Sequence, residues 1–324
     1  IRNIRVLDRT FNYQSHRAKA LFDLFREFPD MRFHLEIHPA LLSEELKQEL
    51  ASMPKGLLHL EAGIQSLHEE VLTVSRRAGK LADALEGLRY LCALDNMETH
   101  ADLIAGLPLY HLSQIFDDVR TLAEYRAGEI QLESLKLLPG TEMRRRAEEL
   151  GICYSPLPPY EVLQTREITP DELQTARQLS RLLDGFYNAS AWQEITRRLI
   201  VEEPDFLTRF LDHLIQIGVI DQPMGLERRG ILLYHFCKEH YPLFLTAMSR
   251  AWIEAGMSLK KEPAERVRTK HVTPPEAWTV CTGTYRDDLR LCKLPAPEEG
   301  RCYWYGFETE SQQLRPVFAA VSEE

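Results

Sequence analysis

An acidic residue interrupts an apolar stretch of the sequence, HADLIAGLP, at residues 100–108. Burying a carboxylate without a partner costs free energy, so Asp102 implies either a strand edge open to water or a bound ligand. Carboxylates and amides can bind ligand hydroxyl groups, and a Lys with a Glu can act as base and acid. Side chains or turn residues suited to such a site follow the other apolar runs at Asp8, Arg9, Thr10, Glu36, His38, Glu61, Gln65, Ser66, Gly106, Lys136, Gly140 and Thr141.

The apolar runs that precede these residues predict a parallel sheet. Short runs of buried character alternate with amphipathic stretches, which predicts β-then-α units that form a closed or partly closed parallel barrel. The carboxyl ends of the strands in such a barrel meet at one rim, where ligands bind, so the polar residues should converge there. The predicted strands span residues 3–8, 31–37, 57–64, 98–108 and 129–140.

The second half of the chain has a different pattern. The strand pattern stops in a proline-rich segment at residues 150–169, and Thr169-Pro170-Asp171-Glu172 predicts a capping box that opens a helix. Further helices are predicted at 190–200, 204–217, 226–238 and 241–256, and short antiparallel strands from Trp278 onward. We therefore expect an α/β protein with a partial (β/α) barrel at 1–155, a linker at 156–169, a mainly helical module at 170–260 and a small tail with short antiparallel strands at 261–324.

Composition limits the classes of partner. A net charge of -10, from 39 basic and 49 acidic residues, disfavours a nucleic-acid partner. Without a secretory signal or an apolar stretch near the roughly 20 residues that cross a bilayer, we expect a cytoplasmic protein with no membrane span. The six cysteines have no metal-binding spacing and predict reduced structural thiols. His34 and His38 alternate on one strand face, where local hydrogen bonds are favoured over a metal site.

Four segments in order carry a family resemblance. FHLEIHPALLSEELKQEL, LEAGIQS followed by Arg76-Arg77, HADLIAGLP and LKLLPGT resemble the second through last strands of the radical S-adenosylmethionine core, over about residues 1–155. The chain is similar to oxygen-independent coproporphyrinogen oxidases and to cobalamin-binding enzymes of the magnesium-protoporphyrin oxidative cyclase type. The resemblance implies a 5'-deoxyadenosyl radical that abstracts a substrate hydrogen or, with cobalamin, drives methylation or ring formation.

The resemblance also implies roles for individual residues. It places Gln65 and Asp102 at the ribose hydroxyls of S-adenosylmethionine, and Arg77 at the methionyl carboxylate, which suits a forked guanidinium. It makes Glu36 a carboxylate that faces the ligand, and it places the backbone of Gly106 and Leu107 against the adenine edge. Asp8 is a weakly matched partner for the methionyl amine.

One family feature is missing from the sequence. The family holds its four-iron cluster with a CxxxCxxC loop after the first strand, and this chain has no such loop. Because NIRVLD resembles the second strand, we expect the first strand, the cluster loop and any cobalamin-binding domain to lie upstream of Ile1. The 4Fe-4S cluster and cobalamin are therefore expected only in a longer protein that acts on a small molecule, for which a tetrapyrrole is one candidate. The chain by itself is expected to be inactive.

Other interpretations use the same residues. A barrel lyase or aldolase would employ Glu61 and Lys136 as acid and base at strand ends. A non-catalytic domain retained for binding or assembly would not depend on the polarity of the rim. At the level of single residues, Asp102 could cap a neighbouring helix or pair with His100. Glu61 and Gln65 could belong to an ordinary strand end.

Overall fold

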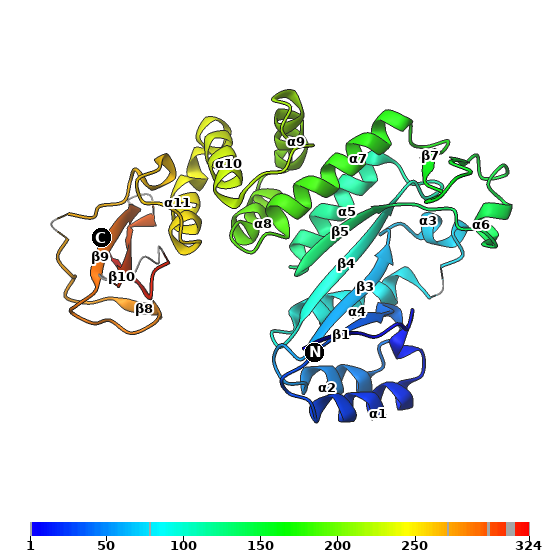
Figure 1. Cartoon of the computed structure of the whole chain (residues 1–324), viewed down its shortest axis with the longest axis horizontal. Helices are drawn as coiled ribbons and strands as arrows, with labels where there is room; N and C mark the ends of the chain where they lie inside the picture. Colours follow the sequence, from blue (N-terminus) through cyan, green and yellow to red (C-terminus); the bar gives the residue numbers. More distant parts are fainter. Residues whose placement is uncertain (1, 78, 271, 297–298, 309–314, 324) are drawn as a thin grey trace. The chain divides into compact units, whose positions relative to one another are not determined.

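The computed structural model describes residues 2–77, 79–270, 272–296, 299–308 and 315–323. The chain divides into two compact units, drawn in Figure 1, which consist of Ile1–Asn188 with Arg197–Asp221 and of Ala189–Thr196 with Gln222–Glu324. Among the described residues, no helix combines the length and apolar character needed to cross a membrane.

The first unit contains the predicted parallel sheet. Its five strands are hydrogen-bonded in the order β1-β2-β3-β4-β5, every neighbouring pair is parallel, and the sheet curls into half of a (β/α) barrel (Figure 1). The fold class predicted from the sequence is confirmed. The strands are β1 (Asn3–Arg5), β2 (Arg32–Ile37), β3 (Leu58–Gln65), β4 (Glu98–Ala105) and β5 (Glu129–Ser134).

The strands of this sheet are apolar on one face only. Successive side chains of a strand point to opposite faces, and one face carries fully buried side chains such as Leu35, Leu60 and Leu103. Polar side chains occupy the alternate positions, as at Glu36, which is paired in register with Glu61. The prediction of buried strands therefore holds for the helix-covered face, and the other face is the polar inner face of the half-barrel.

Helices cover the apolar face because their own apolar residues recur at helical spacing. In α5, for example, Ile115, Val119 and Leu122 are fully buried at intervals of four and three residues. The helices of this unit are α1 (Ser15–Arg26), α2 (Glu44–Ala51), α3 (Glu69–Val74), α4 (Leu81–Ala93), α5 (Leu112–Glu124), α6 (Glu142–Arg145), α7 (Pro170–Leu182) and α9 (Phe206–Gln216), with short turns η1 (Phe11–Tyr13), η2 (Pro39–Leu41) and η3 (Leu183–Tyr187).

Helix α7 begins where the sequence predicts it. Thr169 is its N-cap and Pro170 its first residue, and the Thr169 and Glu172 side chains exchange hydrogen bonds with each other's backbone N–H. Before this helix, a two-stranded hairpin is formed by β6 (Cys153–Tyr154) and β7 (Val162–Gln164).

The second unit joins helices to a small antiparallel sheet. The sheet order is β8-β11-β10-β9, and its faces bury Tyr305 with Cys292 on one side and Trp304 with Phe318 on the other. The predicted late strands are confirmed. The elements are α8 (Gln193–Glu202), whose residues divide between the units, α10 (Leu226–His240), η4 (Pro242–Phe244), α11 (Leu245–Glu254), η5 (Glu262–Ala264), β8 (Thr279–Thr282), β9 (Arg290–Ala296), β10 (Arg301–Phe307) and β11 (Phe318–Glu323).

Candidate functional site

The inner face of the half-barrel contains a hollow toward the carboxyl ends of its strands, which we call the rim hollow. Its volume is about 240 Å³. Gln65 and Asp102, which lie 37 residues apart in the sequence, both line it because β3 and β4 are adjacent and parallel. The residues that line it are Arg9, Glu36, Ile37, Glu61, Gly63, Gln65, Arg77, Asp102, Leu103, Ile104, Gln131 and Glu133.

One oxygen of the Asp102 side chain in the rim hollow is unsatisfied within the described part of the chain. The Oδ1 atom is buried and has no hydrogen-bond partner among the described residues. Burial, together with the nearby carboxylates of Glu61 and Glu36, raises the pKa of Asp102 to about 7, because desolvation and like charges both disfavour ionisation. The side chain therefore holds a proton part of the time at neutral pH and can both donate and accept.

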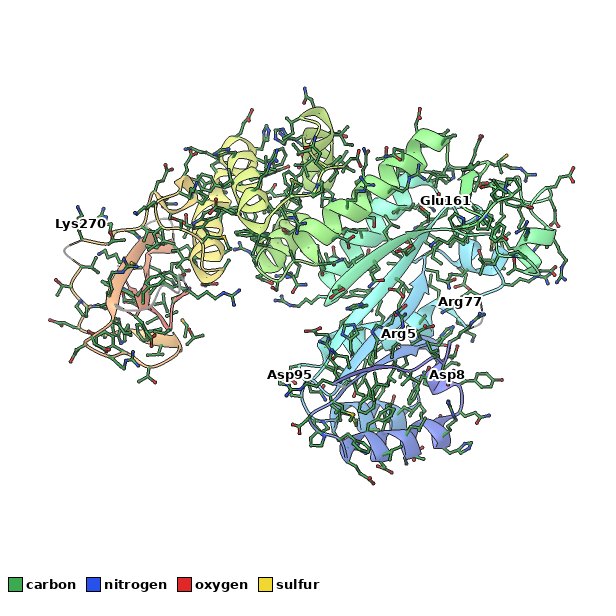
Figure 2. All side chains as sticks on the ribbon, in the orientation of Figure 1. Arg5, Asp8, Arg77, Asp95, Glu161 and Lys270 are labelled. Atoms are coloured by element: carbon green, nitrogen blue, oxygen red, sulfur yellow. The ribbon has the colours of Figure 1, made fainter. Side chains whose placement is uncertain are left out.

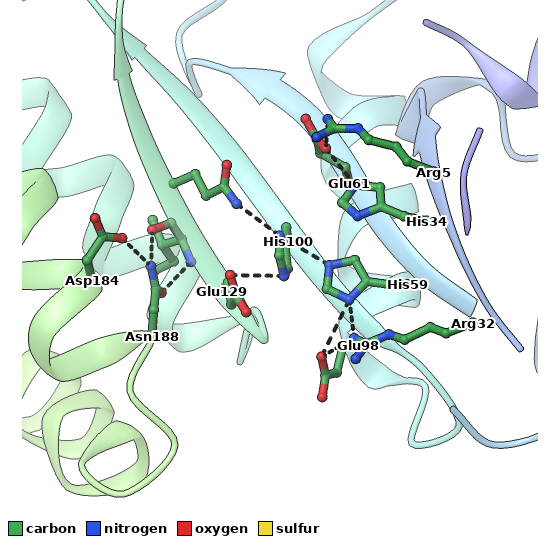
Figure 3. Close-up of polar contacts among 12 residues, drawn as sticks. Arg5, Arg32, His34, His59, Glu61, Glu98, His100, Glu129, Asp184 and Asn188 are labelled. Atoms are coloured by element: carbon green, nitrogen blue, oxygen red, sulfur yellow. Dashed lines mark hydrogen bonds and ion pairs between the residues drawn. The ribbon is translucent and has the colours of Figure 1, made fainter. Parts of the chain in front are cut away.

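The alternative partners considered for Asp102 are occupied elsewhere. The His100 ring lies 3.0 Å from Glu129 Oε2 through Nε2 and 3.0 Å from Gln131 Nε2 through Nδ1 (Figure 3). Asp102 itself lies within β4, four residues before the turn at Gly106, so its position differs from that of an N-cap. The contact of Asp102 with a ligand stays a prediction.

Arg77 places a guanidinium in the same hollow. It follows α3, and its side chain donates a 2.6 Å hydrogen bond to the carbonyl oxygen of Gly63, a residue of β3. A Cβ atom on Gly63 would lie 3.4 Å from the Arg77 guanidinium, which is an ordinary van der Waals contact. Burial lowers the pKa of Arg77, and the Asp102 carboxyl opposes that shift. The labels in Figure 2 locate Arg77 and Arg5 in this unit.

A buried aspartate that the sequence interpretation did not include holds the loop after Gln65. Asp118 of α5 is 3% exposed and accepts hydrogen bonds from the Leu67 backbone N–H (2.8 Å) and the Tyr110 hydroxyl (2.5 Å). Its other carboxylate oxygen lies 3.1 Å from Nε2 of His68. The sequence contains a signal for it, because Asp118 occupies the apolar face of the predicted helix, three residues after Ile115.

We predict that Asp118→Ala lowers the free energy of unfolding of the first unit by about 3 kcal/mol. The substitution leaves the buried Tyr110 hydroxyl and the Leu67 N–H without an acceptor, and each unsatisfied buried group costs about 1–3 kcal/mol. Tyr110→Phe, which removes one hydrogen bond and keeps the acceptor, should cost about 1 kcal/mol. Urea denaturation followed by far-UV circular dichroism measures both, and equal stabilities for the two variants would contradict this role of Asp118.

Several residues of the sequence interpretation lie outside the rim hollow. Gly106, with a φ of +90°, and Leu107, 2% exposed, are both buried, and a Cβ on Gly106 would lie 3.3 Å from Val162 Cγ1. Asp8, labelled in Figure 2, forms a 2.6 Å ion pair with Arg17 that lowers the pKa of Asp8. Their proposed ligand contacts stay predictions.

Only one of the two residues of the lyase interpretation lines the rim hollow. Glu61 lines the rim hollow, but Lys136 is absent from its lining. The Lys136 side chain is 48% exposed, and its Nζ lies 3.8 Å from Glu133 Oε2. Glu61 instead accepts hydrogen bonds from Arg5 (2.9 Å) and lies 2.7 Å from His34 Nε2. The roles of Lys136 and Glu61 as base and acid stay predictions.

No three His, Cys, Asp or Glu side chains among the described residues lie together in a geometry that could hold a metal ion. His38 exchanges backbone hydrogen bonds with the Asn12 amide. Cys292 and Cys302 are buried in the two apolar clusters of the second unit, whereas Cys281 is exposed. The residues present therefore do not fit an iron–sulfur cluster.

Residues 148–249 match a family model described as "Protein of unknown function (DUF4080)". No curated protein matches the chain. The matched residues belong to both units, with 148–188 and 197–221 in the first and the rest in the second, and they do not include the lining of the rim hollow.

Solved structures similar to the chain include the radical S-adenosylmethionine methyltransferase TsrM from Kitasatospora setae, with 16% identity, a TM-score of 0.41 and coverage of 52% of this chain and 32% of that one. Coproporphyrinogen III oxidase from Escherichia coli has 14% identity and a TM-score of 0.33, and the match covers 51% of this chain and 43% of that one. SuiB from Streptococcus suis, bound to S-adenosylmethionine, has 10% identity and a TM-score of 0.35, and the match covers 46% of this chain and 34% of that one. The chain thus spans between about a third and less than half of the length of these structures.

Proposed function

We propose that the rim hollow binds S-adenosylmethionine and that this chain forms part of a radical S-adenosylmethionine enzyme. The observation that carries the proposal is the orphaned, buried Asp102 oxygen in a hollow that it shares with Gln65 and Arg77. A carboxylate and an amide side by side suit a ribose diol, because each hydroxyl both donates and accepts a hydrogen bond. A forked guanidinium in the same hollow suits a carboxylate.

The remaining carboxylates of the rim hollow suit the cationic parts of the cofactor. Glu36 and Glu61 are neighbours across β2 and β3, and both line the hollow. S-adenosylmethionine carries a sulfonium and an ammonium group, and carboxylates within a few ångströms stabilise such charges. Without a bound cation, the same two carboxylates contribute to the raised pKa of Asp102.

The residues of the rim hollow cannot themselves perform the chemistry that an iron–sulfur cluster supplies. In the family that the sequence resembles, an iron–sulfur cluster supplies the electron that cleaves S-adenosylmethionine. The described residues do not fit such a cluster, so they are assigned binding and orientation of the cofactor and exclusion of water from it. Cobalamin dependence, the oxidative cyclase type, a tetrapyrrole substrate and a cytoplasmic location stay predictions.

The proposal is tested by measuring how variants of two arginines bind two ligands. We expect Arg77→Gln to weaken S-adenosylmethionine binding by about tenfold, because a charge-assisted hydrogen bond contributes about 1.5–3 kcal/mol. The same variant should bind 5'-methylthioadenosine, which lacks the amino-acid part, as the unaltered chain does. Arg76→Gln is the control, since that side chain is 65% exposed and pairs with Glu142. Isothermal titration calorimetry measures all the constants, and equal losses for both ligands would remove the assignment of Arg77.

A further inference from the structure

A second hollow, which we call the histidine hollow, lies on the same inner face nearer the amino ends of the strands. Its volume is about 430 Å³, within the range of about 300–1,000 Å³ that small-molecule sites occupy. Arg5 lines it and donates a hydrogen bond to Glu61 of the rim hollow (Figure 3). The two hollows therefore adjoin. A molecule in one would therefore lie close to a molecule in the other.

The wall formed by the first strands carries positive charge, and the other wall carries negative charge. Arg5 and Arg32 come from β1 and β2, whereas Glu98 and Glu129 come from β4 and β5. Asp184, which follows α7, adds to the negative side through its electrostatic effect on Glu129. Figure 3 shows the histidine rings between Glu129 on one side and Arg5 on the other. A molecule that carries a positive and a negative group would meet charges of opposite sign in this hollow.

The surface between these walls is made of imidazole rings. The His34 and His59 rings stack with centroids 4.6 Å apart, and the His59 and His100 rings meet edge to face at 4.0 Å. Burial lowers the pKa of His59 to about 3 and that of His100 to about 4, so neither ring is charged at neutral pH. The rings add hydrogen-bonding and ring surfaces while the arginines and glutamates determine the charges.

The charged groups of the histidine hollow can exchange partners at little cost. Arg32 pairs with Glu98 at 2.6 Å, but the two side chains are 40% and 63% exposed. An ion pair this exposed contributes only about 0–1 kcal/mol to stability, so a ligand that offers Arg32 a carboxylate can replace it. Glu129 lies 3.0 Å from a neutral imidazole, which leaves its negative charge without a cationic partner in that contact.

From this arrangement we infer that the histidine hollow binds a zwitterionic α-amino acid, with its carboxylate on Arg32 and its ammonium group on Glu129. The inference rests on the proposed function in one respect, because it makes the amino acid the substrate of the cofactor in the rim hollow. A planar guanidinium binds a carboxylate through two parallel hydrogen bonds, and a carboxylate accepts from an ammonium group. A tetrapyrrole, whose charged groups are carboxylates, would bring like charges to Glu98 and Glu129.

The experiment uses this chain without S-adenosylmethionine and measures binding by ligand-observed NMR. The probes are the free L-amino acids, their carboxamides and their N-acetyl derivatives. We expect at least one free amino acid to bind, and its carboxamide and N-acetyl derivative to bind at least about tenfold more weakly, because each has lost one charge. Arg32→Gln should remove the discrimination against the carboxamide. Glu129→Gln should remove the discrimination against the N-acetyl derivative. Arg76→Gln, outside the hollow, should leave both kinds of discrimination unchanged.

Three results would overturn the inference: no free amino acid binds, the blocked derivatives bind as well as the free form, or Arg32→Gln weakens all three forms equally. Circular dichroism checks that each variant is folded, and Arg32→Lys, which keeps the charge, should retain discrimination against the carboxamide. Failure here with intact S-adenosylmethionine binding would leave the proposed function standing. Amino-acid binding without S-adenosylmethionine binding would retain the histidine hollow and reject the proposed function.

Discussion

Replacing Asp102 by alanine is expected to weaken binding of S-adenosylmethionine to this chain by about 10- to 100-fold. The reason is that the substitution removes a buried acceptor and donor, and hydrogen bonds to charged groups contribute about 1.5–3 kcal/mol. Asp102→Asn, which keeps the shape and a carbonyl oxygen, should lose less affinity than Asp102→Ala. Among the described residues the Oδ1 atom has no other partner, so no protein hydrogen bond to that atom compensates in the unbound state.

The same side chain is expected to destabilise the unbound protein at neutral pH. Its folded pKa of about 7 lies above the ordinary value of 3.8, so the folded state binds the proton more tightly than the unfolded state does. Its contribution to stability is therefore complete below pH 3.8 and is lost as the pH rises through 7. Asp102→Asn, which cannot ionise, should raise the free energy of unfolding at pH 8 on the order of 2 kcal/mol.

Calorimetric titration and urea denaturation of Asp102→Ala and Asp102→Asn test both expectations together. Asp117→Ala is a matched control, because this aspartate is exposed on α5, next to the buried Asp118. A binding residue should show lower affinity together with higher stability, which is the trade-off expected where function requires an unsatisfied group. Unchanged affinity in Asp102→Ala would withdraw the ribose assignment.

Acidification is expected to destabilise the first unit strongly between pH 6.5 and 4. Burial lowers the folded pKa of His59 to about 3 and of His100 to about 4, below the ordinary value of 6.5. The unfolded state therefore binds more protons in this interval, and the free energy of unfolding falls as the pH falls. For the two rings together the loss is on the order of 4 kcal/mol. Their stabilising contribution is complete above pH 6.5.

The titration of Asp102 opposes this trend, so a variant at Asp102 should change the pH dependence of stability in the opposite direction. Its contribution increases as the pH falls from 7 to 4, so it offsets part of the histidine effect. His59→Gln should make the acid-side loss shallower, whereas Asp102→Asn should make it steeper. His16→Gln, at an exposed position of α1, serves as the control.

The two units of the chain can be followed separately in these measurements. All four tryptophans, Trp192, Trp252, Trp278 and Trp304, belong to the second unit, so tryptophan fluorescence follows that unit alone. Far-UV circular dichroism follows both units, and a change present in dichroism but absent from fluorescence belongs to the half-barrel. If His59→Gln and His16→Gln showed the same pH dependence, the assignment of the acid-side loss to the buried imidazoles would be wrong.

The sequence contains most of the information about the elements of the half-barrel. Apolar runs at strand length and amphipathic stretches between them predict the five strands, and β2 (Arg32–Ile37) was expected at 31–37. The capping box at Thr169 predicts the first residue of α7. Such patterns depend on neighbours within one or two turns or strand positions, so they can be read from local sequence.

Only the tertiary structure determines which side chains share a hollow and in what state. The parallel pairing of β3 and β4 brings Gln65 and Asp102 together, and burial then raises the pKa of Asp102. The same curvature gathers His34, His59 and His100 from three strands, whereas Lys136, also predicted at a strand end, stays outside. Register, curvature and burial arise from contacts between residues tens of positions apart, which local periodicity does not encode.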